Sequence, residues 1–191
     1  MIALLFGLLI FIGIHMLRIV APAWRTQQIA RFGEQKWKGL YSLVSIAGFA
    51  LLVWGYGQSR ATPELWAVPR GMAHLAALLT LIAFVLLAAA YVPRNHFKAK
   101  LGHPMLLGTK LWAFAHLLSN ARLGDMLLFG SFLVWAIIAF AASRRRDRLA
   151  ATQYPAGTIQ GSVITLVVGM AAWAGFALFA HAWLIGVRPL G

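Results

Sequence analysis

The chain has 191 residues, of which 61% are hydrophobic and 11% charged, and its mean hydropathy is +0.78. This balance excludes an ordinary soluble domain and indicates an integral membrane protein. The formal charge of +13 would suggest nucleic-acid binding in a soluble chain. Here the basic residues gather between apolar runs, as is usual in membrane proteins, so we expect no nucleic-acid partner. The absence of cysteine excludes disulfides, thiolate ligands and iron–sulfur clusters.

Apolar runs long enough to cross a bilayer, which takes about 20 helical residues, recur along the whole chain. They cover residues 2–20, 39–57, 71–92, 104–120, 124–142 and 161–183. The first run is predicted to be a retained helix and not a signal peptide, because no positive charge precedes it and Arg18 lies at its far end. The sequence therefore predicts an all-α membrane protein, a six-transmembrane-helix bundle that forms a single domain over residues 1–191, with short loops as connections.

Basic residues are unevenly shared between the two sides of this predicted bundle. The first, third and fifth connections hold Arg25, Arg31, Lys36, Lys38, Arg94, Lys98, Lys100, Arg144, Arg145, Arg146 and Arg148, whereas the other side holds Arg60, Arg70, Arg122 and Arg188. The positive-inside rule then predicts cytoplasmic basic loops and both termini outside. The tryptophans near the run ends, at positions 24, 37, 66 and 183, are expected to form an interfacial belt.

The six histidines lie at different predicted depths, and ionisable groups inside membrane spans are usually functional. At about 1.5 Å per residue, His103 lies at the cytoplasmic interface, His15 about 10 Å and His116 about 20 Å from it, with His74 and His181 further out. His96 falls in a basic loop and is expected to be solvated. His103 precedes Pro104, so it is either a helix N-terminal residue or a group with a direct chemical role.

The helix face that carries His116 also carries Met105, Thr109, Trp112 and Ala113. Its two small residues, Thr109 and Ala113, predict a shallow groove in which a flat molecule would approach the helix. The alternative is that His116 only forms a hydrogen bond to a neighbouring helix.

Two histidines have an arginine on the same helix face, closer to the membrane surface: Arg18 follows His15 by three residues, and Arg70 precedes His74 by four. Haem b has the same polarity, because imidazole binds its iron in the apolar layer while its propionates reach outward to cations. The alternative for each arginine is that its side chain extends to the interface without a ligand.

Five segments together resemble the NnrU family of bacterial inner-membrane proteins over nearly the whole chain, most weakly at residues 143–159. They are FIGIHMLRIVAPAWR, WKGLYSLVSIAGFALLVWGYG, HLAALLTLIAFVLLAAAYVP, GHPMLLGTKLWAFAHLLSN and LIGVRPL. The family is associated with denitrification and nitric oxide metabolism. It is related to the plant and cyanobacterial zeta-carotene isomerase, a membrane haem b enzyme with a redox-switched iron.

The resemblance to that isomerase implies haem b as a cofactor, with His15 and His116 as the axial ligands. The isomerase's His-Pro motif, followed by Trp-x-x-Ala-His, matches His103, Pro104, Trp112, Ala115 and His116. Ala113 stands where the isomerase has a cysteine of its redox switch, so the same switch cannot operate. Gly102 stands where a basic residue commonly precedes the His-Pro pair, which weakens a more remote likeness to isoprenylcysteine carboxyl methyltransferases. His74, closer to His116 in depth, is the reserve second ligand.

Three functions stay open on the sequence alone. The first is a haem protein that acts on a hydrophobic or gaseous small molecule in the membrane, either as an isomerase-like enzyme or as a redox component. The second is a non-catalytic assembly or expression factor for nitrite and nitric oxide reductases. The third is a methyltransferase that uses the turn at His103 and Pro104.

Overall fold

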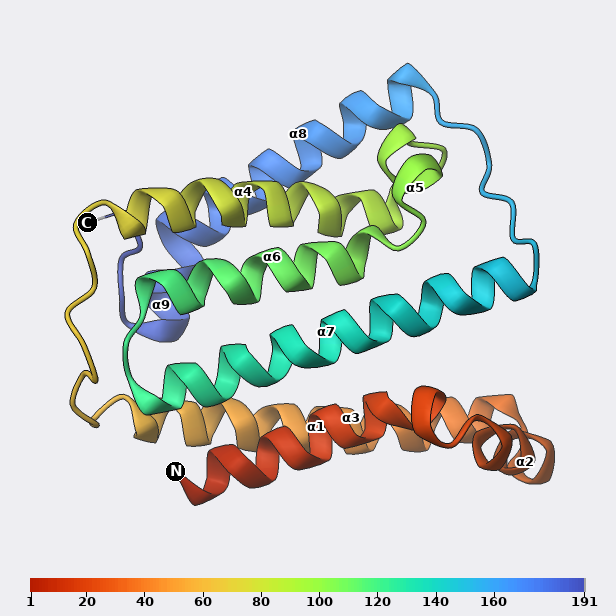
Figure 1. Cartoon of the computed structure of the whole chain (residues 1–191), viewed down its shortest axis with the longest axis horizontal. Coiled ribbons are helices and arrows are strands. Elements are labelled where there is room, and N and C mark those ends of the chain that lie inside the picture. The colour runs from red at the N-terminus through yellow and green to blue at the C-terminus, as the bar shows by residue number, and fades with distance from the viewer. Residues whose placement is uncertain (191) are drawn as a thin grey trace.

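The structure is a computed structural model that describes residues 1–190. Its long helices lie side by side (Figure 1). They are α1 (Ile2–Val20), α3 (Glu34–Ser59), α4 (Met72–Tyr91), α6 (Pro104–Ser119), α7 (Leu123–Leu149) and α8 (Ile159–Gly175), the last of which continues through the π-helical turn η1 (Phe176–Ala180) into α9 (His181–Ile185). Five helices are long and apolar enough to cross a membrane: α1, α3, α4, α7 and the continuous segment Ile159–Ile185. The chain is therefore an all-α, multi-pass membrane protein.

The predicted apolar runs are all helical, but several connections expected to be loops are helical too. The first connection contains α2 (Pro22–Phe32), and the third contains α5 (His96–Leu101). The fifth was expected to hold its four arginines in a loop, whereas Arg144, Arg145, Arg146 and Arg148 belong to the last turns of α7. Arginine is a good helix former, so a polar extension of an apolar helix costs little. α6 has only 16 residues and is too short to count among the five candidate spans.

The helices form a layered bundle in which α7 is central (Figure 1). α4 packs between α8 and α6, and α7 lies between α6 and the antiparallel pair of α1 and α3. The N-terminus, the α3–α4 and α6–α7 connections and α9 lie at one end of the bundle. At the other end lie α2, α5 and the α7–α8 connection, so the predicted basic segments do share one end.

Glycines allow the backbones of α1 and α3 to touch. A Cβ atom on Gly7 would overlap the backbone of Leu52, and one on Gly55 would overlap the backbone of Leu4. Around this contact a buried apolar cluster joins four helices: Leu4 and Leu8 of α1, Leu52 of α3, Ala113 of α6, and Leu128 and Phe129 of α7. The cluster fixes the faces that α1 and α6 turn towards α7.

Exposure differs among the four tryptophans expected in the interfacial belt. Trp24, Trp66 and Trp183 are exposed, as a belt would require, whereas Trp37 is only 7% exposed and does not fit that prediction. The Trp37 ring lies edge-on to that of Trp24 in α2, with 5.8 Å between ring centroids. Trp37 is buried because the helix α2, which stands where a loop was expected, folds back over the start of α3.

Candidate cofactor site

His15 is held in one orientation by its own helix. Its Nδ1 atom lies 2.6 Å from the carbonyl oxygen of Phe11, one turn earlier. A carbonyl oxygen only accepts hydrogen bonds, so Nδ1 must carry a proton and donate it, which leaves the lone pair on Nε2. A backbone carbonyl that binds the distal nitrogen is the usual way in which proteins orient a metal-ligating histidine. The His15 imidazole is therefore prepared to bind a metal or accept a proton through Nε2.

His116 is arranged in the same way on α6. Its Nδ1 donates to the carbonyl oxygen of Trp112 at 2.8 Å, and its ring stacks on Phe129 of α7 with 4.5 Å between centroids and an interplanar angle of 25°. The predicted interhelical hydrogen bond is absent from the contacts of residues 1–190, because the polar partner of Nδ1 belongs to α6 itself. Like His15, His116 keeps Nε2 available as an acceptor.

Aromatic side chains of α7 separate the two histidines. Phe132 lies 5.7 Å from Phe11 and 5.6 Å from Trp112, measured between ring centroids. Trp135, one turn further along, lies 5.7 Å from the His15 ring. His15 and His116 thus stand near opposite ends of one aromatic row, offset along α7 by about 9 Å, since Trp135 lies six steps of about 1.5 Å beyond Phe129. In this arrangement they do not share one ligand position.

Packing fills the Ala113 part of the groove expected beside His116. Ala113 is fully buried and packs in the apolar cluster with Leu128 and Phe129. The hydroxyl group of Thr109, which is half-buried, donates to the carbonyl oxygen of Met105 in its own helix. Ala113 therefore serves close packing against α7 and leaves no space for a flat molecule at that position.

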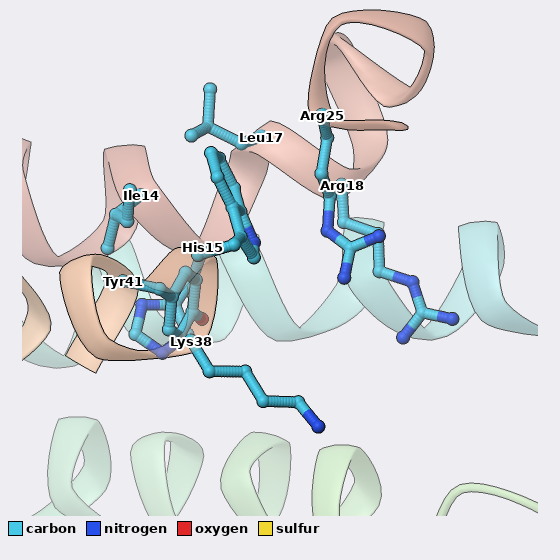
Figure 2. Close-up of a pocket in the computed structure, with 8 residues that line it drawn as sticks. Ile14, His15, Leu17, Arg18, Arg25, Lys38 and Tyr41 are labelled. Atoms are coloured by element: carbon cyan, nitrogen blue, oxygen red, sulfur yellow. The ribbon is translucent and has the colours of Figure 1, made fainter. Parts of the chain in front are cut away.

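A pocket of 260 Å³ opens beside His15 instead, at the end of the bundle where α1, α2 and α3 meet (Figure 2). It is lined by Ile14, His15, Leu17, Arg18, Arg25, Trp37, Lys38 and Tyr41. Arg18 was predicted from its spacing to His15. Arg25 and Lys38 were counted only as loop charges, because the sequence analysis expected a loop where α2 holds Arg25 and where the first turns of α3 hold Lys38.

The residues of this pocket fit haem b in kind. The group needs an imidazole ligand, cations for two propionates, and apolar or aromatic walls, and His15, the arginines and Trp37 supply them. The indole N–H of Trp135, whose ring lies 5.7 Å from that of His15, is buried and has no hydrogen-bond partner in residues 1–190, but Trp135 does not line this pocket. The volume lies slightly below the range of about 300–1,000 Å³ for ligand pockets, but long side chains form the rim and are able to move.

The reserve ligand lies elsewhere. His74 and Arg70 are both exposed near the start of α4, at the opposite end of the bundle from the His15 pocket. The Nδ1 atom of His181 donates a hydrogen bond to the carbonyl oxygen of Val187, 2.7 Å away, because a carbonyl oxygen can only accept. Of the two predicted His–Arg pairs, His15 and Arg18 line the pocket described above.

His103 is the N-terminal cap residue of α6, followed by Pro104 at the first helical position, as one of the two predicted alternatives requires. Its Nε2 lies 2.8 Å from a carboxylate oxygen of Asp147, which also accepts a hydrogen bond of 2.8 Å from the Tyr154 hydroxyl. Burial and this hydrogen bond raise the pKa of Tyr154. The sequence did not reveal the cluster of His103, Asp147 and Tyr154, because Asp147 lies among arginines in the sequence.

His96 is exposed as expected, and its Nδ1 atom lies 2.7 Å from the Ser162 hydroxyl oxygen.

No group of three or more histidine and carboxylate side chains is placed to hold a metal ion within residues 1–190. The apolar helices are those of a multi-pass membrane protein. Its pocket contains a single histidine, so it is a candidate site for a cofactor that already carries its metal. The model of the NnrU protein family matches residues 3–189, so the chain belongs to the NnrU family. No curated protein and no solved structure matches it.

Proposed function

We propose that this protein is a haem b protein of the bacterial inner membrane that serves denitrification and nitric oxide metabolism, with His15 as the principal iron ligand. The observation that supports this most is the state of His15. Its Nδ1 is committed to the Phe11 carbonyl, its Nε2 has no hydrogen-bond partner within residues 1–190, and its ring lines a pocket that also contains Arg18 and Arg25. The NnrU membership supports the link to denitrification.

We further propose that α6 completes a bundle of six spans with both termini outside the cytoplasm. α6 lies between α4 and α7 and runs between the same two ends as they do (Figure 1). Six crossings bring the chain back to the side on which it began, and the basic segments at the other end satisfy the positive-inside rule.

When bound, haem would supply an iron centre able to accept an electron or bind a diatomic gas such as nitric oxide. The residues of the chain would set the conditions for that chemistry. The Phe11 carbonyl holds the His15 ring in the orientation in which Nε2 carries the lone pair. Phe11 and Trp135 keep water away from the ring, and Arg18 places positive charge at the polar edge of the site.

His116 is proposed as a second ligand whose use requires a rearrangement. Trp112 and Phe132 occupy the space towards His15, so their rings would have to turn before one haem could reach both imidazoles. The structure as it stands favours one strong ligand at His15, and a change in side-chain rotamers would add the second.

The test is an absorption spectrum of the detergent-purified protein after expression with added haem, oxidised and dithionite-reduced. We expect a Soret band that His15→Ala abolishes while the protein still accumulates. His116→Ala should keep haem but shift a low-spin spectrum to high-spin, and His74→Ala should have a smaller effect. His96→Ala is the matched control, because His96 is exposed outside the bundle.

Two results would contradict the proposal. A His15→Ala variant with an unchanged spectrum would remove His15 as the ligand. A wild-type protein that retains no haem would instead favour the alternative of an assembly or expression factor for nitrite and nitric oxide reductases.

A further inference from the structure

The pocket beside His15 has an excess of positive charge that its own residues do not neutralise. Lys38 forms an ion pair with Glu34 at 2.8 Å. Arg18 and Arg25 form no salt bridge and donate no side-chain hydrogen bond within residues 1–190, where the ion pairs formed by arginine are those of Arg122 and Arg144. Guanidinium groups in a pocket are ordinarily matched by carboxylate or phosphate oxygens.

The two arginines come from different elements and converge on one space. Arg18 lies in the last turn of α1, and Arg25 lies near the start of α2. In Figure 2 both side chains reach the same end of the pocket, whereas His15 and Tyr41 lie at the other end. Two guanidinium groups arranged in this way can contact different oxygens of one anionic head group, because each offers several N–H donors in a fixed plane.

The remaining walls suit an amphipathic ligand and not a free ion. Ile14 and Leu17 of α1 and the indole of Trp37 supply apolar walls of the same pocket. The pocket lies at the end of the bundle that carries the basic segments, at the ends of α1 and α3. This is the depth at which the acidic groups of membrane molecules lie above their apolar bodies.

α2 forms one wall of the pocket but is only lightly attached. None of its residues is buried, and it is joined to α3 by Gly33, whose φ of +83° favours glycine. An amphipathic helix at the membrane surface that carries arginine is suited to contact with acidic lipid. Its position also allows the pocket to widen for a ligand.

We propose that this pocket is an oxyanion-binding site, in which Arg18 and Arg25 hold the acidic group of an amphipathic membrane molecule. The same chemistry can come from two sources, the phosphate of an anionic phospholipid or the propionates of haem. The phospholipid arm does not depend on the proposed haem function.

The first arm of the test measures the thermal unfolding of the full-length, detergent-purified protein with phosphatidylglycerol or with net-neutral phosphatidylcholine. The wild type should be stabilised more by phosphatidylglycerol. Arg18→Gln combined with Arg25→Gln should weaken the apparent affinity by about tenfold or more, as expected for the loss of charge-assisted hydrogen bonds. Arg25→Gln alone, on a helix without buried residues, should fold normally and show part of the effect.

The second arm compares the affinity for haem b with that for its dimethyl ester, in which both propionates are blocked. If propionates use the site, the wild type should prefer the free acid, and the double variant should lose that preference. If only phospholipid responds, the site is confirmed with lipid as its source. If neither haem b nor its dimethyl ester binds, the proposed haem function fails, and the phospholipid measurement alone decides whether the pocket is an oxyanion site.

Arg31→Gln is the matched control: it removes the same charge from the same helix, but Arg31 lies over the Phe32 ring and does not line the pocket. Glu34→Gln should strengthen anion binding, because it frees Lys38. The proposal is overturned if neither acidic ligand is preferred over its neutral counterpart by the wild type. It is equally overturned if Arg31→Gln weakens binding as much as Arg25→Gln.

Discussion

Asp125 shows at the scale of single residues how this bundle accommodates a carboxyl group. It is 3% exposed. One carboxylate oxygen accepts a hydrogen bond of 2.7 Å from the Tyr56 hydroxyl of α3, and the other accepts one of 3.0 Å from the backbone N–H of Arg122. The position at the start of α7 adds the favourable field of a helix N-terminus. Asp125 is therefore a structural tie between α3 and α7 and not a coupling site for ions.

Tyr56→Phe should lower the free energy of unfolding by about 1 kcal/mol, the usual net value of one hydrogen bond, and by more if the carboxylate is left without a replacement partner. Tyr91→Phe is the control, because Tyr91 is 78% exposed. Denaturant unfolding in detergent would measure both. Equal losses in the two variants would show that the Tyr56 hydroxyl contributes nothing specific.

Tyr154 gives a second prediction at this scale. Because its pKa is raised in the folded protein, folding favours the neutral phenol. That contribution to stability is complete below the ordinary tyrosine pKa of about 10 and is lost as the pH rises through the raised value. Stability measured across this alkaline range should fall less steeply in Tyr154→Phe than in the wild type. An identical slope would mean that the hydroxyl is not coupled to folding.

At the scale of elements, the sequence indicates the apolar helices well and the polar ones badly. Long apolar runs were enough to place α1, α3, α4, α6, α7 and α8, since few other structures satisfy their backbones in lipid. α2 and α5 were missed because they are short and partly polar, so that they resemble loops when only hydropathy is considered. Their helical state is supported by packing, such as that of Trp24 on Trp37.

The contact between α1 and α3 yields a prediction with a built-in control. Gly55→Ala should cost about 1–3 kcal/mol, the usual range for overpacking, because the new Cβ atom would overlap the Leu4 backbone. Gly57→Ala, two residues later in the same helix, places its Cβ atom in open space and should be neutral or slightly stabilising. The comparison uses thermal unfolding in detergent. Similar effects of the two substitutions would contradict the close approach of α1 and α3.

For the whole molecule, spacing along the sequence placed His15 and Arg18 on one helix face, and both line the same pocket, whereas the ligand pair of His15 and His116 came from the family resemblance and stays a prediction. Spacing could not indicate that aromatic rings of α7 lie between the histidines, because that depends on how α7 packs against two other helices. Nor could it place Arg25 and Lys38 beside His15, since a tertiary fold brings those side chains from separate elements.

The proposed topology is tested by fusing reporters to the chain. A periplasm-active reporter after Gly191 should be active, and one inserted in the α7–α8 connection should be inactive, because the basic segments are retained in the cytoplasm. A cytoplasm-active reporter should show the opposite pattern at both positions. Cytoplasmic activity at the C-terminal fusion together with periplasmic activity in the α7–α8 connection would contradict the proposed topology, and it is the pattern expected if α6 does not cross the membrane or if the whole bundle is inverted.

The shortness of α6 has a consequence for the surrounding lipid. Its 16 residues span about 24 Å, against about 30 Å for a typical hydrocarbon core, whereas its neighbour α7 has 27 residues. Such hydrophobic mismatch is relieved when the bilayer thins beside the short helix. The two ends of α6, with His103 at one and Asn120 at the other, would then lie at the bottom of shallow dimples in the membrane. The protein should accordingly prefer thin bilayers, and water should reach further into it along α6 than along any other helix of the bundle.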